Sequence, residues 1–140
     1  LSTRIADGFS LLQSGKLTVT VMSFGFKYGL PADADMVADM RFLPNPFWNE
    51  DLRPFTGKDQ QVADFVLSQP NAQQFLPNYI ATLAPVLAGY VAENKRYATI
   101  AVGCTGGKHR SVAMAIKLAE ALGTDPELRV HVKHRDLGKE

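Results

Sequence analysis

The segment Ile-Ala-Val-Gly-Cys-Thr-Gly-Gly-Lys-His-Arg-Ser occupies residues 100–111. An apolar, β-rich stretch over residues 97–102 predicts a strand that runs into this glycine-rich turn. After the turn, apolar residues recur at helical spacing, at Val112, Ala115, Ile116, Ala119 and Leu122. The segment therefore predicts a strand, a loop of the size that holds an anion, and a helix.

The chemistry of this loop favours phosphate binding. Its glycines allow backbone N–H groups to point inward at the partly positive start of the helix. Lys108 and His109 add donors, and Arg110 could hold two oxygens as a fork. The alternative is a tight turn with solvated basic residues, but here glycines and donors coincide at a helix start. We predict that the loop's ligand contacts are Cys104, Thr105, Gly106, Gly107, Lys108, His109 and Arg110.

Two catalytic interpretations of the loop compete with plain binding. A nucleotide P-loop needs four residues between its glycines and Ser or Thr after the lysine, but Gly103 and Gly107 enclose three and His109 follows Lys108. The spacing of Cys104, Gly107, Arg110 and Ser111 resembles the signature of cysteine-dependent phosphatases.

That family usually has His before the cysteine, where Gly103 stands here, and it needs a general acid, for which Asp39 and Asp51 are the only candidates. We interpret Cys104 as a small buried residue and keep a phosphatase that uses Cys104 and Arg110 as the alternative.

Composition predicts one cytoplasmic domain. The chain has 140 residues, 46% hydrophobic content, a net charge of +1 and a single cysteine, which cannot form an internal disulfide. We find no signal segment and no apolar run near the length of a membrane span, so we expect no membrane partner. The three histidines lack the acid and thiol neighbours of a zinc motif, so we predict no metal. Residues 1–15 read as a linker or terminal helix, and the start at Leu1 suggests a piece of a longer polypeptide.

The first half of the chain predicts two strands, each followed by candidate ligand contacts. Residues 17–22 and 36–42 have β-rich patterns, and the loop after the first strand offers Lys27 and Tyr28. Asp39 and Arg41 would face the same side of the second strand, with Arg41 at the site and Asp39 in a structural pair. An irregular, proline-rich stretch over residues 43–57 carries Phe47, Trp48 and Phe55, which we expect to cover the core.

The second half predicts scaffold helices and a basic strand. One helix is expected over residues 62–67 and another from Pro77 to Val91, with a bend near Pro85. Residues 128–133 alternate and predict a strand. Its basic stripe could hold RNA phosphates or form a solvated face, and consists of Arg129, His131 and Lys133 continued by Arg135 and Lys139. Strands that alternate with helices predict a single α/β domain over residues 16–140, with a largely parallel sheet whose ligands bind at the carboxyl ends of its strands.

Five motifs follow one another along the chain: Ser-Phe-Gly-Phe-Lys-Tyr-Gly-Leu-Pro (23–31), Asp-Met-Arg-Phe-Leu-Pro-Asn-Pro (39–46), Leu-Arg-Pro-Phe-Thr-Gly (52–57), Gly-Cys-Thr-Gly-Gly-Lys-His-Arg-Ser (103–111) and His-Arg-Asp-Leu (134–137). Together they resemble the C-terminal domain of the RapZ/YvcJ family. The resemblance implies a fold similar to a phosphofructokinase subdomain, homodimers or larger assemblies, and a preceding P-loop half that would carry any ATP or GTP, leaving this domain without a cofactor. It also implies a regulatory sensor or adapter that binds amino-sugar metabolites and, in some bacteria, small RNA or a regulatory protein.

Carried over by position, the implied ligand contacts are Lys27, Asp39, Arg41, Asn45, Thr105, Gly106, His109 and Arg110. Phe47 stands where the family commonly has His, which favours a larger ligand such as a nucleotide sugar. Asp136 and Glu140 dilute the basic tail that RNA-binding members carry. The sequence thus predicts a non-catalytic domain that binds an amino-sugar phosphate or a UDP-amino sugar such as UDP-GlcNAc.

Overall fold

A computed structural model describes residues 16–139, which form one α/β domain around a four-stranded parallel sheet. The strands lie in the order β2-β3-β1-β4. Their bounds are Leu17–Gly25 for β1, Met36–Asp39 for β2, Tyr97–Cys104 for β3 and Leu128–His134 for β4. The predicted α/β class with a parallel sheet is confirmed.

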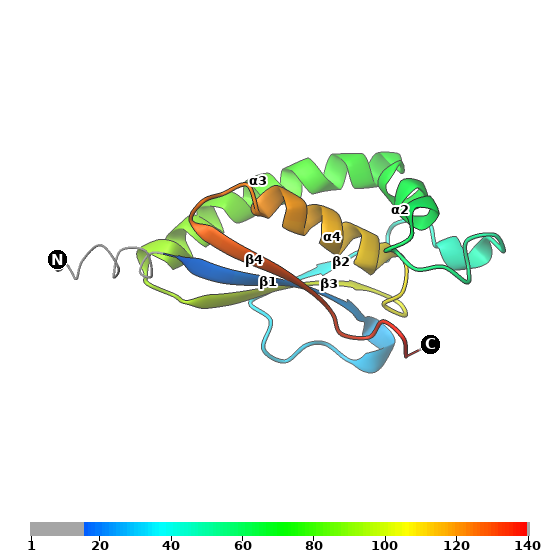
Figure 1. The fold of residues 1–140 in the computed structure, drawn as a ribbon, viewed down its shortest axis with the longest axis horizontal. Helices are drawn as coiled ribbons and strands as arrows, with labels where there is room; N and C mark the ends of the chain where they lie inside the picture. Colours follow the sequence, from blue (N-terminus) through cyan, green and yellow to red (C-terminus); the bar gives the residue numbers. More distant parts are fainter. Residues whose placement is uncertain (1–15, 140) are drawn as a thin grey trace.

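The three helices lie on one side of the sheet (Figure 1). They are α2 (Gln60–Leu67), α3 (Pro70–Ala92) and α4 (Arg110–Leu122), and two short 3₁₀ turns, η1 (Phe26–Tyr28) and η2 (Pro46–Trp48), follow β1 and precede α2. Alternate residues of β1, including Leu17, Val19 and Val21, are fully buried against the helices. One continuous core therefore joins the sheet to all three helices.

Helix α3 differs from the sequence prediction in where it starts and in its continuity. It begins at Pro70, whose fixed φ and missing N–H suit the first helical turn, and not at Pro77. It then continues to Ala92 through both Pro77 and Pro85. The buried side chains Ala72, Leu83 and Leu87 fasten both ends of the helix to the core, which explains why the internal prolines do not divide it.

The same helix corrects the expectation about apolar runs. Over 23 residues α3 is long and apolar enough to span a membrane by length and composition, with a mean hydropathy of 1.3 in its most apolar window. It is the one such helix in residues 16–139. Only 11% of that window is buried within the domain, where Ala72, Leu83 and Leu87 belong to the core.

Strand β2 is shorter than predicted because a turn replaces its last three residues. The Asp39 carboxylate accepts the Arg41 backbone N–H at 2.8 Å, and the Leu43 N–H donates to the Met40 carbonyl at 3.2 Å. These bonds turn the chain away from the sheet after Met40, whose N–H still donates to the Gly103 carbonyl of β3 at 2.7 Å.

The carboxyl ends of β1 and β3 lie side by side, with Gly25 paired to Cys104. A Cβ atom at Gly25 would lie 2.5 Å from the carbonyl carbon of Gly106, so only glycine permits this approach. The loop after β3 is thus pressed against the end of β1.

Candidate functional site

A cavity of about 260 Å³ opens at the carboxyl ends of β1 and β3. Four segments that are distant in sequence form it: η1, the residues around η2, the end of β3 and the loop that leads into α4. Its lining residues are Lys27, Asn45, Phe47, Trp48, Cys104, Thr105, Gly106, Lys108, His109 and Arg110. Eight of the predicted contacts therefore line one cavity, where Phe47 and Trp48 join them.

Arg110 is the most constrained cation in this cavity. Only 4% of it is exposed, and its Nη1 donates to the carbonyl oxygens of Arg41 at 3.2 Å and Leu43 at 3.0 Å. Its Nη2 makes a 3.3 Å bond to the Thr105 hydroxyl, while its buried Nε has no hydrogen-bond partner within residues 16–139. Both terminal nitrogens of the guanidinium are therefore held by the chain, which fixes its positive charge at the cavity.

Lys108 and His109 are tied to the proline-rich loop. The Lys108 Nζ donates to the Arg53 carbonyl at 2.9 Å, and the His109 Nε2 lies 3.1 Å from the same oxygen, to which it must donate. The Gly57 N–H donates back to the Lys108 carbonyl at 2.9 Å. These bonds fix the proline-rich loop over the start of α4.

His109 is a neutral group at this site. Burial lowers its pKa below the usual range, and the neighbouring charges of Lys108 and Arg110 lower it further, against the hydrogen bond to the Arg53 carbonyl. His109 therefore acts here as a neutral hydrogen-bond donor that positions the loop, while Lys108 and Arg110 provide the positive charge.

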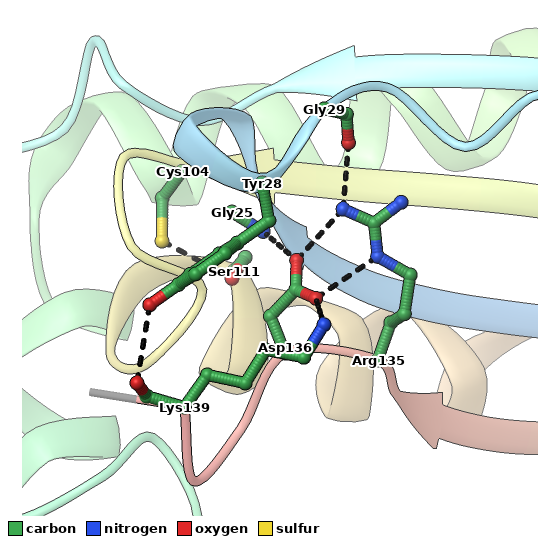
Figure 2. Close-up of polar contacts among 8 residues, drawn as sticks. All are labelled: Gly25, Tyr28, Gly29, Cys104, Ser111, Arg135, Asp136 and Lys139. Carbon is green, nitrogen blue, oxygen red and sulfur yellow. Dashed lines mark hydrogen bonds and ion pairs between the residues drawn. The ribbon is translucent and has the colours of Figure 1, made fainter.

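Cys104 lies at the end of β3 with its thiol turned toward the start of α4 (Figure 2). The Sγ atom donates to the Ser111 hydroxyl at 3.1 Å, and the residue is buried. The arrangement suits a small residue that closes the floor of the cavity, and it also places a hydroxyl beside the sulfur.

Four predicted contacts do not line the cavity, namely Tyr28, Asp39, Arg41 and Gly107. Asp39 and Arg41 form an exposed ion pair, with 2.7 Å between Arg41 Nη2 and Asp39 Oδ2, and this hydrogen bond lowers the pKa of the Asp39 carboxyl. The Arg41 guanidinium also lies 3.9 Å from the ring centre of Phe26. Arg41 serves the site through its backbone carbonyl, which accepts from Arg110.

Phe47, Trp48 and Phe55 are exposed and lie outside the core, so the expectation that they cover the core is wrong. Trp48 is 75% exposed and Phe47 is 40% exposed, and their rings meet edge to face with 5.1 Å between centres. The Arg53 guanidinium lies 4.8 Å from the Phe47 ring centre. Their position next to the predicted contact Asn45 was the available sequence signal for a role at the cavity.

The predicted basic stripe is divided in two. Arg129, His131 and Lys133 are exposed along β4. Arg135 and Lys139 instead fold back and form ion pairs with the buried Asp136, each at 2.8 Å. Within residues 16–139, no group of three His, Cys, Asp or Glu side chains could hold a metal ion.

The chain is similar to a family profile and to several named proteins, and these comparisons agree with one another. A profile described as the RapZ C-terminal domain matches residues 17–138. The chain is 63% identical to a nucleotide-binding protein of Renibacterium salmoninarum, 61% to one of Clavibacter michiganensis subsp. michiganensis and 58% to one of Frankia alni, in each case over all 140 residues. These alignments cover 46% to 48% of the relatives, so the chain spans about half of their length. Because this profile matches nearly the whole chain, from residue 17 to residue 138, the chain belongs to the RapZ C-terminal domain family.

Proposed function

We propose that this domain is a non-catalytic sensor that binds a phosphorylated amino sugar or a nucleotide amino sugar in the cavity between η1, η2 and the loop before α4. The observation that carries the proposal is the Arg110 guanidinium, which lines the cavity and is held in place by the Arg41 and Leu43 carbonyl oxygens at Nη1. A guanidinium fixed in this way is a positioned positive charge with several N–H donors, which suits a phosphate.

The charge of the cavity supports an anionic ligand. Among its ten described lining residues three are cationic, Lys27, Lys108 and Arg110, and none is acidic. Backbone N–H groups at the start of α4 add partial positive charge in the same place. A phosphate would therefore be held by fixed charges and dipoles.

The aromatic wall supports a ligand larger than phosphate alone. Exposed Trp48 and Phe47 line the same cavity as the cationic residues and give a sugar ring or a nucleobase a surface to stack on. This arrangement favours a nucleotide amino sugar over an amino-sugar monophosphate, because the former has both an anionic and a planar part.

We further propose a cytoplasmic, regulatory role in which the domain acts in a homodimer or larger assembly. The related chains are named nucleotide-binding proteins and are about twice as long, so nucleotide handling such as ATP or GTP binding is assigned to the part that this chain does not match. The residues for RNA contact are Arg129, His131 and Lys133, which are exposed along β4.

The test is phosphorus NMR of glucosamine-6-phosphate and of UDP-GlcNAc with near-stoichiometric protein. Both signals should broaden or shift, with the larger change for UDP-GlcNAc. Arg110→Lys keeps the charge but loses the fork, and should weaken binding by roughly tenfold or more. Arg96→Ala, which removes a cation at the opposite end of β3, is the control and should bind normally. Unchanged spectra with both ligands would refute the proposal.

One observation keeps a cysteine phosphatase as the second candidate. The Ser111 hydroxyl lies 3.1 Å from the Cys104 sulfur, where it would stabilise a thiolate. The same NMR samples, followed over hours, decide between the two. We expect no inorganic phosphate signal to appear, and Cys104→Ser should bind as the unmodified chain does. A growing phosphate signal that Cys104→Ser removes would establish the phosphatase instead.

A further inference from the structure

Asp136 is a buried carboxylate that accepts four hydrogen bonds (Figure 2). Its Oδ2 accepts from the Gly25 N–H at 2.8 Å and from Arg135 Nη2 at 2.8 Å. Its Oδ1 accepts from Arg135 Nε at 3.0 Å and from Lys139 Nζ at 2.8 Å. We call this arrangement the Asp136 clasp: Asp136, its two cations and the Gly25 amide.

The clasp closes the C-terminal tail, residues 135–139, over η1. Arg135 Nη2 donates to the Gly29 carbonyl at 2.6 Å, and the Tyr28 hydroxyl donates to the Lys139 carbonyl at 3.3 Å. The tail thus holds both ends of the short segment that carries Lys27 to the cavity.

The clasp also lies directly against the loop from Cys104 to Arg110, which we call the anion-binding loop. Gly107 has a φ of +77°, and a Cβ atom there would be 2.7 Å from the Gly25 nitrogen and 3.2 Å from the Asp136 Cβ. The Lys27 N–H donates to the Thr105 carbonyl at 3.2 Å, which links η1 to the same loop. Gly25 and its carboxylate partner therefore form the surface on which Gly106 and Gly107 rest.

We propose that Asp136 is a positioning residue for ligand binding: by fastening the tail to Gly25 and η1, it holds the anion-binding loop and Lys27 in the geometry that receives a phosphate. Asp136 does not line the cavity, and its negative charge opposes an anionic ligand, so its contribution is through position and not through charge. This inference rests on the proposed function, because it concerns the same cavity.

The proposal makes the tail and the ligand site depend on each other. A partner that takes Arg135 or Lys139 away from Asp136 opens the clasp, loosens η1 and the loop, and weakens phosphate binding. By thermodynamic linkage a bound phosphate must hold the tail closed to the same extent.

The decisive variant is Asp136→Asn, because an effect of charge and an effect of position predict opposite changes in the affinity for phosphate. If only charge mattered, loss of a negative group near the cavity would tighten the binding of an anion. If Asp136 positions the loop, the variant loses both ion pairs and should bind inorganic phosphate about tenfold more weakly. The affinity is measured from amide proton and nitrogen shifts of the labelled 140-residue chain during phosphate titration.

Two further variants complete the design. Asp125→Asn removes the same charge from an exposed turn, where Asp125 accepts the Glu127 N–H, and should leave the phosphate affinity unchanged. Lys139→Met breaks one ion pair at a half-exposed side chain, without a change in the core, and should weaken binding by about threefold. This variant tests the clasp even if Asp136→Asn does not fold.

Ligand-free spectra and proteolysis supply readouts beyond affinity. In Asp136→Asn and Lys139→Met the amide signals of Gly25, Gly106 and Gly107 should move in the absence of phosphate. Saturating phosphate should slow tryptic cleavage after Arg135 in the unmodified chain but not in Lys139→Met.

The outcomes separate this inference from the proposed function. If the unmodified chain binds phosphate, Arg110→Lys loses it, and the Asp136 and Lys139 variants bind normally or more tightly, the clasp is overturned while the ligand site stands. If the unmodified chain shows no saturable shift during phosphate titration, the proposed function fails. If the amide signals of Gly25, Gly106 and Gly107 also stay unchanged in the clasp variants, the clasp is overturned as well.

Discussion

At the scale of single residues, Asp136 combines deep burial with a retained charge. Burial alone would raise its pKa, but hydrogen bonds from Arg135, the Gly25 N–H and Lys139 outweigh that effect and lower the pKa to about 2. The carboxylate is therefore ionised in the folded chain at any pH near neutrality, and it is the ion-pair partner of Arg135 and Lys139.

This lowered pKa predicts an acid-sensitive component of stability. The unfolded carboxyl has a pKa near 3.8, so the unfolded state takes up a proton first as the pH falls. The stabilisation from Asp136 is complete above about pH 4 and is lost between about pH 4 and pH 2, and amounts to roughly 2 kcal/mol. Urea unfolding at pH 5 and pH 2.5 should show a smaller loss of unfolding free energy for Asp136→Asn than for the unmodified chain. Equal losses in the two chains would contradict the assignment.

The close contact of Gly25 with the anion-binding loop gives a second prediction at this scale. Gly25→Ala would place a methyl group 2.5 Å from the Gly106 carbonyl carbon, where only backbone can yield. We expect a loss of about 1–3 kcal/mol in unfolding free energy together with weakened phosphate binding. Gly89→Ala is the matched control: nothing lies within 4 Å of the added group, and alanine in α3 should stabilise the chain by about 1 kcal/mol. Equal effects at the two positions would refute the contact.

Residue chemistry shows how far the site could be predicted from the sequence. Lys27, Asn45 and the loop from Cys104 to Arg110 stand beside glycines or prolines at strand ends, and most of them line the cavity. The cavity role of Trp48 could not be read from its side chain, because an aromatic residue covers a core as readily as it forms a wall. Tyr28 and Asp39 face other partners, since two residues that share a segment with a contact can point to opposite sides.

At the scale of elements, sequence periodicity located α4 and the starts of the strands well, and it located the start of α3 and the end of β2 poorly. β1 and β3 begin with alternating buried and more exposed residues and continue with unbroken buried runs at residues 21–25 and 100–104, and both patterns follow the apolar residues of the sequence. The first turn of α3 has only Ala72 as a buried apolar residue, so the apolar pattern begins later than the helix. The end of β2 was unpredictable for a different reason: one side-chain bond from Asp39 to the Arg41 N–H is enough to leave the sheet.

The internal prolines of α3 give a prediction for this element. Pro85 lacks the N–H that would donate to Ala81 and is exposed, so Pro85→Ala restores a helical hydrogen bond without a change in the core. Proline also restricts the unfolded chain, and alanine gives up that stabilising effect. The net result should be a gain of about 1–2 kcal/mol in unfolding free energy. The exposed Ala84→Gly should change stability in the opposite direction, by about 1 kcal/mol. A neutral result for both substitutions would mean that α3 is not helical at this point in solution.

At the scale of the whole molecule, the ligand cavity and the core belong to one cooperative unit. β1 and β3 supply the centre of the core and also end at the cavity, and α4 begins there and packs across the sheet. Periodicity could predict that the strand ends converge, but not the order β2-β3-β1-β4, because the apolar residues of a strand do not specify which strands lie beside it.

This unity predicts that a cavity ligand stabilises the entire domain. Glucosamine-6-phosphate or UDP-GlcNAc at a hundred times its dissociation constant should add about 2.7 kcal/mol and raise the melting temperature by roughly 10 °C in a single transition. Calorimetry of the unmodified chain and of Arg110→Lys at the same ligand concentration checks this, and the variant should show little shift. Two separate transitions, of which the ligand moves one, would contradict a single unit.

The position of β1 in the sheet also has a consequence on the ribosome. Both neighbours of this strand come much later in the chain: β3 starts at Tyr97 and β4 at Leu128. At roughly 5–20 residues per second, the first strand is synthesised several seconds before any partner strand exists. During that interval β1 has no neighbouring strand among those described, and its apolar side chains lack the core that later covers them. The nascent chain therefore depends on the exit tunnel or on chaperones to shield Leu17, Val19 and Val21 until Cys104 has emerged.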